Sequence, residues 1–153
     1  MIKSVVSVVL AIAVMFSLCA CSSEKLLVLE SFSSTVSFQM DDISVKGVLD
    51  YKTGEDITFT VTEPENLRDI VFTESKVKKD EVIINYSKLK DESPVYLLIC
   101  IIKSMTESEI YIPLKSEYTF SGVACSAEFK TKINCETDEI ISIETGNFTY
   151  NFE

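Results

Sequence analysis

Histidine, the side chain that most often transfers protons or binds metals near neutral pH, is absent from this chain of 153 residues. Ser–His and Cys–His nucleophile pairs are therefore excluded within it. Acidic residues are plentiful, since 24 Asp and Glu stand against 14 Lys and Arg, for a formal net charge of −10. This balance argues against a nucleic-acid partner, because phosphate binding requires clustered basic side chains.

Carboxylates gather at three places where paired acids could do chemistry: around Pro64, after Met105 and after Cys135. These residues are Glu63, Glu65, Asp69, Glu107, Glu109, Glu136, Asp138 and Glu139. A glycosidase needs two carboxylates roughly 5 to 9 Å apart across a cleft, and nothing in the sequence pairs any two of them. Calcium-loop, zinc, phosphate-loop and nucleophile-elbow spacings do not occur either. We interpret the acids as solvated turn residues and expect no enzyme, no metal site and no cofactor.

The one dense basic cluster consists of Lys76, Lys78 and Lys79, followed at once by Asp80 and Glu81. Charge runs of this kind are usually solvated. We therefore expect a solvent-exposed turn here rather than a binding patch.

Two of the five cysteines lie at the end of an apolar N-terminal run, in the stretch Leu18-Cys19-Ala20-Cys21. Lys3 gives a basic start, and the run from Val5 to Leu18 is too short for a comfortable transmembrane helix of about 20 residues. The stretch looks like a bacterial lipobox with Cys21 as the lipidated residue. Two or more acyl chains anchor stably where a single chain is marginal.

Three other interpretations of this stretch are weaker. Lipidation of Cys19 would place Leu18 where a small residue is wanted. A redox pair would need Cys-x-x-Cys spacing instead of Cys-x-Cys, and an uncleaved single-span anchor would need a longer apolar run. We expect residues 1–20 to be a lipoprotein signal peptide, 21–23 the lipidated cysteine with a short tether, and 24–153 one domain. The protein is then extracytoplasmic and held to the cell membrane.

Most of the domain shows the period-two alternation of half-buried strands. The pattern predicts strands over 32–40, 43–51, 57–61, 82–86, 123–135, 141–143 and 148–152. Turns are predicted at Asp41-Asp42, residues 52–55, Thr137-Asp138 and Gly146-Asn147, and Pro64 ends the third strand. The segment 123–135 is expected to be one long strand, or two strands joined by a bulge.

One segment departs from this alternation, "SPVYLLICIIKSM" from Ser93 to Met105. Ser93 can cap a helix and Pro94 suits the first helical position. A buried strand is the alternative, since Val and Ile favour strands. A helix as apolar as this one must be covered nearly all round, and the concave face of a curved sheet could cover it.

Cys125 and Cys135 invite a disulfide in an exported protein. Ten residues along one strand would place them about 33 Å apart, whereas a bridge needs Cα atoms within about 7 Å. We therefore expect them not to pair and to behave as small buried apolar residues. Whether Cys100 of the expected helix pairs with either one stays open.

A meander followed by a Pro-ended strand, a central helix and a returning meander resembles the LolA/LolB lipoprotein-carrier family. The stretch "DYKTGEDITFTVTEPENLRDIVFTESKVKKDEVIINYSKLK" is similar to LolA-like lipoproteins of Gram-positive bacteria. Pro64 to Leu67 holds the family's Pro-x-x-Leu turn, and Ser87 to Leu89 holds a second turn. In the tail, Gly122 leads a strand and Glu136-Thr137 forms the following turn. The resemblance implies an α+β fold, a curved antiparallel half-barrel sheet with one central helix packed in its concave face.

Such a fold would form an apolar cleft between sheet and helix. The residues expected to line it are Phe32, Phe38, Phe59, Leu98, Ile102, Phe129 and Phe148. Large apolar side chains are first of all core, so these residues have two interpretations. In one, the protein binds a lipid or an acyl chain in the cleft. In the other, the helix fills the cleft and the protein is a non-catalytic structural or interaction lipoprotein of the envelope, with an envelope protein as partner.

Overall fold

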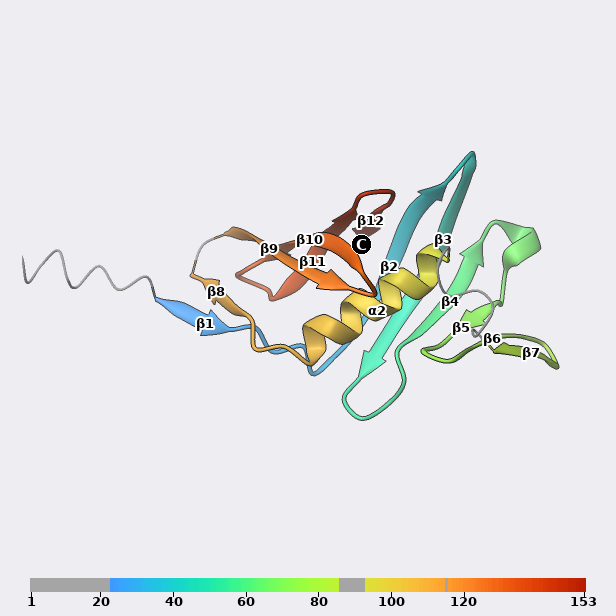
Figure 1. Cartoon of the computed structure of the whole chain (residues 1–153), viewed down its shortest axis with the longest axis horizontal. Coiled ribbons are helices and arrows are strands. Elements are labelled where there is room, and N and C mark those ends of the chain that lie inside the picture. Colours follow the sequence, from blue (N-terminus) through green and yellow to red (C-terminus); the bar gives the residue numbers. More distant parts are fainter. Residues whose placement is uncertain (1–22, 86–92, 115) are drawn as a thin grey trace, which may run out of the picture.

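The structure is a computed structural model that describes residues 23–85, 93–114 and 116–153. Within these ranges, ten strands form one antiparallel sheet in the order β7-β6-β5-β4-β3-β2-β12-β11-β10-β9. Strands β1 (Glu24–Leu26) and β8 (Tyr111–Pro113) form a separate two-stranded sheet. Figure 1 shows the helix α2 (Pro94–Thr106) lying across the large sheet, with β1 and β8 at one end of the molecule.

The expected α+β half-barrel with a central helix was wrong. Strands take 56% of the described residues and helices 13%, so the protein is mostly β. The large sheet is open and ends in the edge strands β7 and β9. The physical reason lies in the sequence pattern, because nearly every segment outside Pro94–Thr106 alternates with period two and can bury one face only as a strand.

The first half of the sheet is the predicted meander. It consists of β2 (Ser31–Met40), β3 (Ile43–Lys52) and β4 (Thr58–Glu63), which pair in succession. Asp41 has a φ of 51° in the two-residue turn between β2 and β3, a conformation that Asp tolerates better than most residues. The strand, turn and Pro64 predictions are confirmed here, and a short 3₁₀ turn, η1 (Glu65–Leu67), follows Pro64.

The predicted turn at Lys76–Lys79 was wrong, since these residues form strand β6 (Lys76–Lys79). It pairs with β5 (Val71–Phe72) on one side and with β7 (Val82–Asn85) on the other. The turn follows β6 directly, at Asp80-Glu81, where Asp80 has a φ of 52°. Three lysines suit this place because a strand near the edge of a sheet keeps its side chains in water.

The expectation over 123–135, one long strand or two strands joined by a bulge, was also wrong. A two-residue turn at Cys125-Ser126 divides it into β9 (Glu117–Ala124) and β10 (Ala127–Asn134). Both turn residues have positive φ, 49° and 66°, as a type I′ hairpin requires. The turn reverses the inward parity, so Ala124 and Phe129 are buried while Val123 is 64% exposed. Strands β11 (Glu139–Thr145) and β12 (Thr149–Phe152) follow as predicted, with Asp138 in the turn before them.

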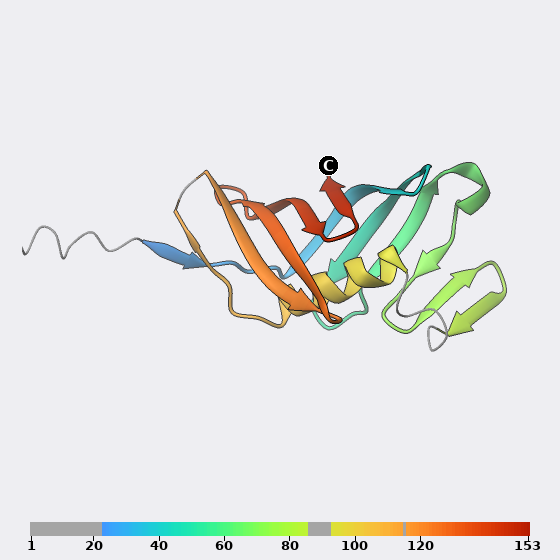
Figure 2. The ribbon, with the colours of Figure 1, turned by 45° about the horizontal axis from the view of Figure 1, so that its top comes forward.

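Helix α2 begins where the sequence predicted, and the buried-strand alternative is excluded. Ser93 caps it, its Oγ accepting a hydrogen bond of 3.3 Å from the Tyr96 N–H, and Pro94 occupies the first turn. Seven of its thirteen residues are buried. Both views show the helix against one face of the sheet (Figures 1 and 2), and that face supplies most of the remaining core residues.

Candidate docking surface

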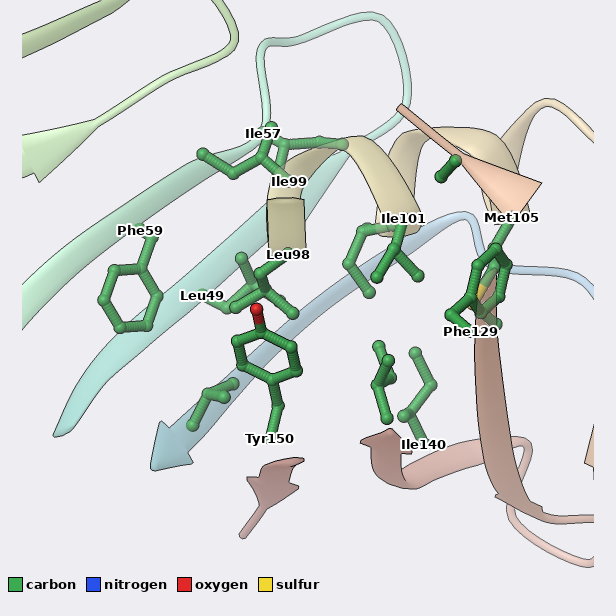
Figure 3. Close-up of a cluster of buried hydrophobic side chains, with 14 of the residues drawn as sticks. Leu49, Ile57, Phe59, Leu98, Ile99, Ile101, Met105, Phe129, Ile140 and Tyr150 are labelled. Atoms are coloured by element: carbon green, nitrogen blue, oxygen red, sulfur yellow. The ribbon is translucent and has the colours of Figure 1, made fainter. Parts of the chain in front are cut away.

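The seven residues expected to line an apolar cleft are brought together, but as packed core. Phe38, Phe59, Leu98, Ile102 and Phe129 are all buried, with at most 3% of each side chain exposed. Phe32 and Phe148 are half-buried and pack against the same cluster. Figure 3 shows Phe59, Leu98 and Phe129 of this group among the side chains that fill the space between the sheet and α2.

Aromatic contacts connect this core across the strands. The ring of Phe38 lies 5.4 Å from that of Tyr150 and 6.1 Å from that of Phe59, centroid to centroid. Phe148 lies 6.2 Å from Tyr150. Tilted pairs at these distances stabilise beyond simple burial, by about 0.5–1.5 kcal/mol each. A ligand entering this space would have to displace these rings.

Helix α2 is held on the sheet by contacts along its length. At its start, the Tyr150 hydroxyl donates a hydrogen bond of 2.8 Å to the Pro94 carbonyl. At its end, the Thr131 hydroxyl contacts the Met105 sulfur at 3.4 Å. Such contacts at both ends favour a filled sheet face over a lid that opens.

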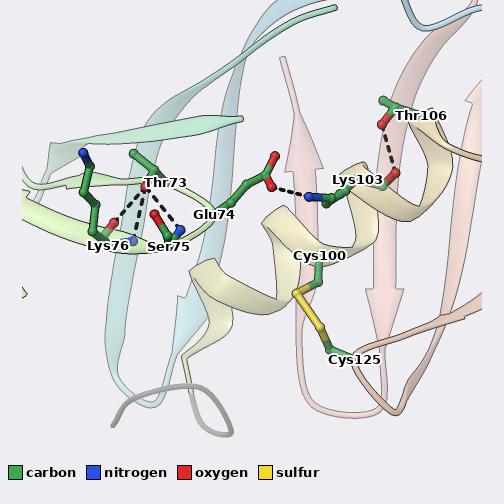
Figure 4. Close-up of polar contacts among 8 residues, drawn as sticks. All are labelled: Thr73, Glu74, Ser75, Lys76, Cys100, Lys103, Thr106 and Cys125. Carbon is green, nitrogen blue, oxygen red and sulfur yellow. Dashed lines mark hydrogen bonds and ion pairs between the residues drawn. A yellow bond between two sulfur atoms is a disulfide. The ribbon is translucent and has the colours of Figure 1, made fainter. Parts of the chain in front are cut away.

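Two further contacts hold the helix between Pro94 and Met105 (Figure 4). Cys100 forms a disulfide with Cys125 at the tip of the β9–β10 turn, their Cα atoms 6.3 Å apart. Lys103 forms an ion pair with Glu74, which raises the Lys103 pKa through a hydrogen bond and charge attraction. The open question of Cys100 is thus answered.

The cysteine predictions are confirmed in one part and wrong in another. Cys125 and Cys135 do not pair, because they lie at opposite ends of β10. Cys135 is a buried free thiol, as expected. Cys125 is exposed and bridged rather than buried, because it stands in a turn that the unbroken alternation had concealed.

The carboxylates singled out in the sequence are ion-paired with basic residues or exposed to solvent in the structure. Glu65 pairs with Arg68 at 2.9 Å, and Asp138 with Lys25 at 2.7 Å. Glu107 and Glu109 are exposed. In the described ranges, His, Cys, Asp and Glu do not gather in any group of three that could hold a metal ion. No helix among those residues has the length and apolar character needed to cross a membrane.

Among the described residues, three successive exposed apolar side chains lie on the edge strand β7. Its residues Val82, Ile83 and Ile84 are 61%, 57% and 50% exposed, on both faces of the strand. We call these three residues the β7 edge. Contiguous exposed apolar residues on an edge strand, which is paired on one side only, are a template for association with another chain.

A basic strand lies beside the β7 edge. Lys78 pairs in register with Ile83, and Lys79 with Val82. Lys79 also donates a hydrogen bond of 3.2 Å to the Asn66 carbonyl. The alternation in the sequence predicted a strand with Val82 and Ile84 on one face, together with Tyr86, which lies outside the described residues. That prediction overlooked Ile83. With Val82 and Ile84 on either side of it, three successive residues are apolar, so neither face of the strand is polar.

Cys21 also lies outside the described residues, so its predicted lipidation stays a prediction. The β7 edge and β1 are at opposite ends of the molecule in both views (Figures 1 and 2). Strand β1 begins at Glu24, three positions after Cys21.

No protein-family model matches this chain, and no curated protein matches it. The resemblance to the lipoprotein carriers therefore stays a prediction, while the half-barrel that it implied is replaced by the open sheet.

Proposed function

We propose that this protein is a non-catalytic lipoprotein of the cell envelope that binds a protein partner through the β7 edge. The observation that carries the proposal is the exposure of Val82, Ile83 and Ile84 on the outermost strand of the sheet. Backbone groups at such an edge can pair with an added strand, and apolar side chains on both faces supply affinity. The lysines of β6 favour a partner with acidic residues beside its contact strand.

Two observations support the extracytoplasmic part of the proposal. The stretch Leu18-Cys19-Ala20-Cys21 resembles a lipobox, and a disulfide joins Cys100 to Cys125. Stable disulfides are typical of exported proteins, because the cytosol keeps thiols reduced. An anchor at Cys21 would place β1 near the membrane and present the β7 edge away from it.

Binding of a lipid or acyl chain is not favoured by any specific contact in the described structure. The seven residues expected to line an open cleft are packed among themselves and against α2. A pocket-bound acyl chain gains about 25 cal/mol per Å² of buried apolar surface, but that surface is already buried by the protein itself.

The test places a photo-crosslinking amino acid at position 83 of the full chain in living cells. We expect one adduct of discrete mass, which disappears when Val82 and Ile84 are both replaced by Glu. The matched control places the crosslinker at Val123, an apolar position on the other edge strand that is 64% exposed, against 57% for Ile83. Equal labelling at both positions, or none at position 83, would contradict the proposal. If native mass spectrometry finds a bound lipid instead, that result would favour the lipid-binding function over the interaction function.

A further inference from the structure

The small sheet of β1 and β8 has an exposed apolar outer face. Leu26 pairs in register with Tyr111, so both side chains lie on the same face of the two strands. They are 44% and 55% exposed. Val28 follows two positions after Leu26 and is 53% exposed. We call these three residues the β1–β8 face.

The opposite face of the same segment is turned to the protein core. Ile112, which pairs in register with Lys25, is fully buried. Leu27 is buried too, and its N–H donates a hydrogen bond of 2.8 Å to the carbonyl of the buried Ile110. A sheet with one face on the core usually carries polar side chains on the other. Here both faces are apolar, so the outer one needs an explanation beyond folding.

The position of the β1–β8 face in the chain indicates what covers it. Two residues, Ser22 and Ser23, separate the predicted lipidation site Cys21 from Glu24, where β1 begins. An extended chain advances at most about 3.6 Å per residue, so three steps span at most about 11 Å. With acyl chains on Cys21 inserted in the bilayer, β1 is therefore held within about 11 Å of the membrane surface.

The side chains of the β1–β8 face suit the boundary between lipid headgroups and acyl chains. Leu26 and Val28 gain free energy when they leave water. Tyr111 offers an apolar ring together with a hydroxyl that stays hydrated, the combination that enriches tyrosine at membrane interfaces. Apolar faces that lie on a membrane enter this boundary by about 5–10 Å, a depth that exposed side chains of a surface strand can reach.

The charge beside this face selects the kind of lipid. Glu24 is exposed and lies on the same face of β1 as Leu26, two positions away. Lys25 is on the opposite face and is paired with Asp138 at 2.7 Å. An unpaired carboxylate next to the contact is repelled by anionic headgroups. Zwitterionic headgroups therefore suit the β1–β8 face better than anionic ones.

We propose that the β1–β8 face rests on the lipid surface of the membrane that holds the anchor, with its three side chains between the headgroups. A flexible tether alone would let the domain rotate freely, whereas this contact fixes which side of the domain meets the lipid. The inference rests on the lipid anchor of the proposed function. It goes beyond the β7 edge, because it concerns the other end of the molecule and a lipid instead of a protein.

Tryptophan fluorescence tests this contact, because the chain contains no tryptophan of its own. The full acylated chain carrying Tyr111→Trp is reconstituted in phosphatidylcholine vesicles. Phosphatidylcholine brominated near the headgroup end of its acyl chains should quench the emission about twofold, since the ring would lie at that depth. Leu26→Trp, a second variant on the same face, should be quenched alike. The matched control Val123→Trp, at a 64% exposed position on β9, should stay unquenched.

A further pair of variants shows whether the apolar side chains make the contact. Leu26→Ser with Val28→Ser should remove most of the quenching of the tryptophan at position 111. The matched control, Val82→Ser with Ile84→Ser at the β7 edge, should leave that quenching unchanged.

The possible failures are distinguishable. Absent quenching at positions 26 and 111, while the protein stays in the vesicle fraction, would overturn this inference and leave the anchor in place. A blue-shifted but unquenched tryptophan would also overturn it, because a protein would then cover the face. Equal quenching at position 123 would show that the contact is not specific. Protein that is absent from the vesicle fraction would overturn the anchor as well, whereas a loss of crosslinking at Ile83 concerns the β7 edge alone.

Discussion

The hydroxyl of Tyr150 donates a hydrogen bond of 2.8 Å to the carbonyl of Pro94, which joins the last strand of the sheet to the first turn of α2. Tyr150 is fully buried, and Figure 3 shows its hydroxyl directed toward the helix. The two residues are 56 positions apart in the sequence. This contact therefore depends on both halves of the chain being folded.

Replacing Tyr150 by Phe should lower the free energy of unfolding by about 1–2 kcal/mol. The change keeps the ring and removes the Tyr150 donor from the buried Pro94 carbonyl. Urea denaturation of the chain beginning at Ser22 measures it. The matched control is Tyr51→Phe, a half-buried tyrosine, and an equal loss there would show that the Tyr150 hydrogen bond has no special weight.

Alkaline pH should weaken the fold through the same residue. Burial raises the pKa of the Tyr150 phenol above its ordinary value of about 10. The contribution of the protonated Tyr150 phenol to the free energy of unfolding is thus fully present below about pH 10. It is lost as the pH rises further, at up to about 1.4 kcal/mol per pH unit. Ion-paired lysines such as Lys103 act in the same direction, because their pKa values are also raised.

The variant Tyr150→Phe separates the effect of Tyr150 at alkaline pH from that of the ion-paired lysines, since it keeps the lysines. Unfolding followed by circular dichroism at several alkaline pH values should show a shallower decline for the variant than for the natural protein. Tyrosinate absorbance of the natural protein should show one tyrosine that ionises only on unfolding. Parallel pH curves for the two proteins would contradict this assignment.

Gly47→Ala should destabilise the protein by about 2–3 kcal/mol, as expected for overpacking in a tight core. A Cβ atom there would lie 2.4 Å from the Phe59 ring and 2.6 Å from the Thr60 carbonyl oxygen. Gly146→Ala is the control, since a Cβ atom added at that position would meet nothing within 4 Å. Thermal unfolding of both variants compares them, and similar melting temperatures would exclude the close approach of Phe59 to Gly47.

Removing the disulfide by Cys100→Ser should cost about 2–4 kcal/mol, as expected for a loop of separation 25. Cys125→Ser should cost the same, because either change breaks the same bond. Mass analysis after alkylation should find Cys135 as the thiol that reacts only when the chain is denatured. Additive losses in the double variant would contradict a shared bond.

Cys21→Ala should move the protein from the membrane fraction to the soluble fraction of cells. The replaced thiol is the predicted site of acylation, and without acyl chains the membrane anchor is lost. Metabolic labelling with an azido fatty acid measures the attachment. Cys19→Ala is the control and should keep the label, whereas loss of the label from that variant would move the attachment site.

The sequence by itself determined the elements whose signals are local. Alternation over Phe32–Met40 and Ile43–Tyr51 predicted two strands, and Ser93-Pro94 predicted the start of the helix, because side-chain period and capping act within a few residues. The sequence also excluded Ser–His and Cys–His pairs within its 153 residues, because it contains no histidine.

Only the tertiary structure decided how these elements meet. The turn at Cys125-Ser126 was hidden, since neither residue is typical of positive φ and the alternation continues across it. The pairing of Cys100 with Cys125 followed from that turn. Whether the aromatic residues line a cleft or fill a core depends on where α2 lies. Such relations depend on residues far apart in the chain, so no local pattern carries them.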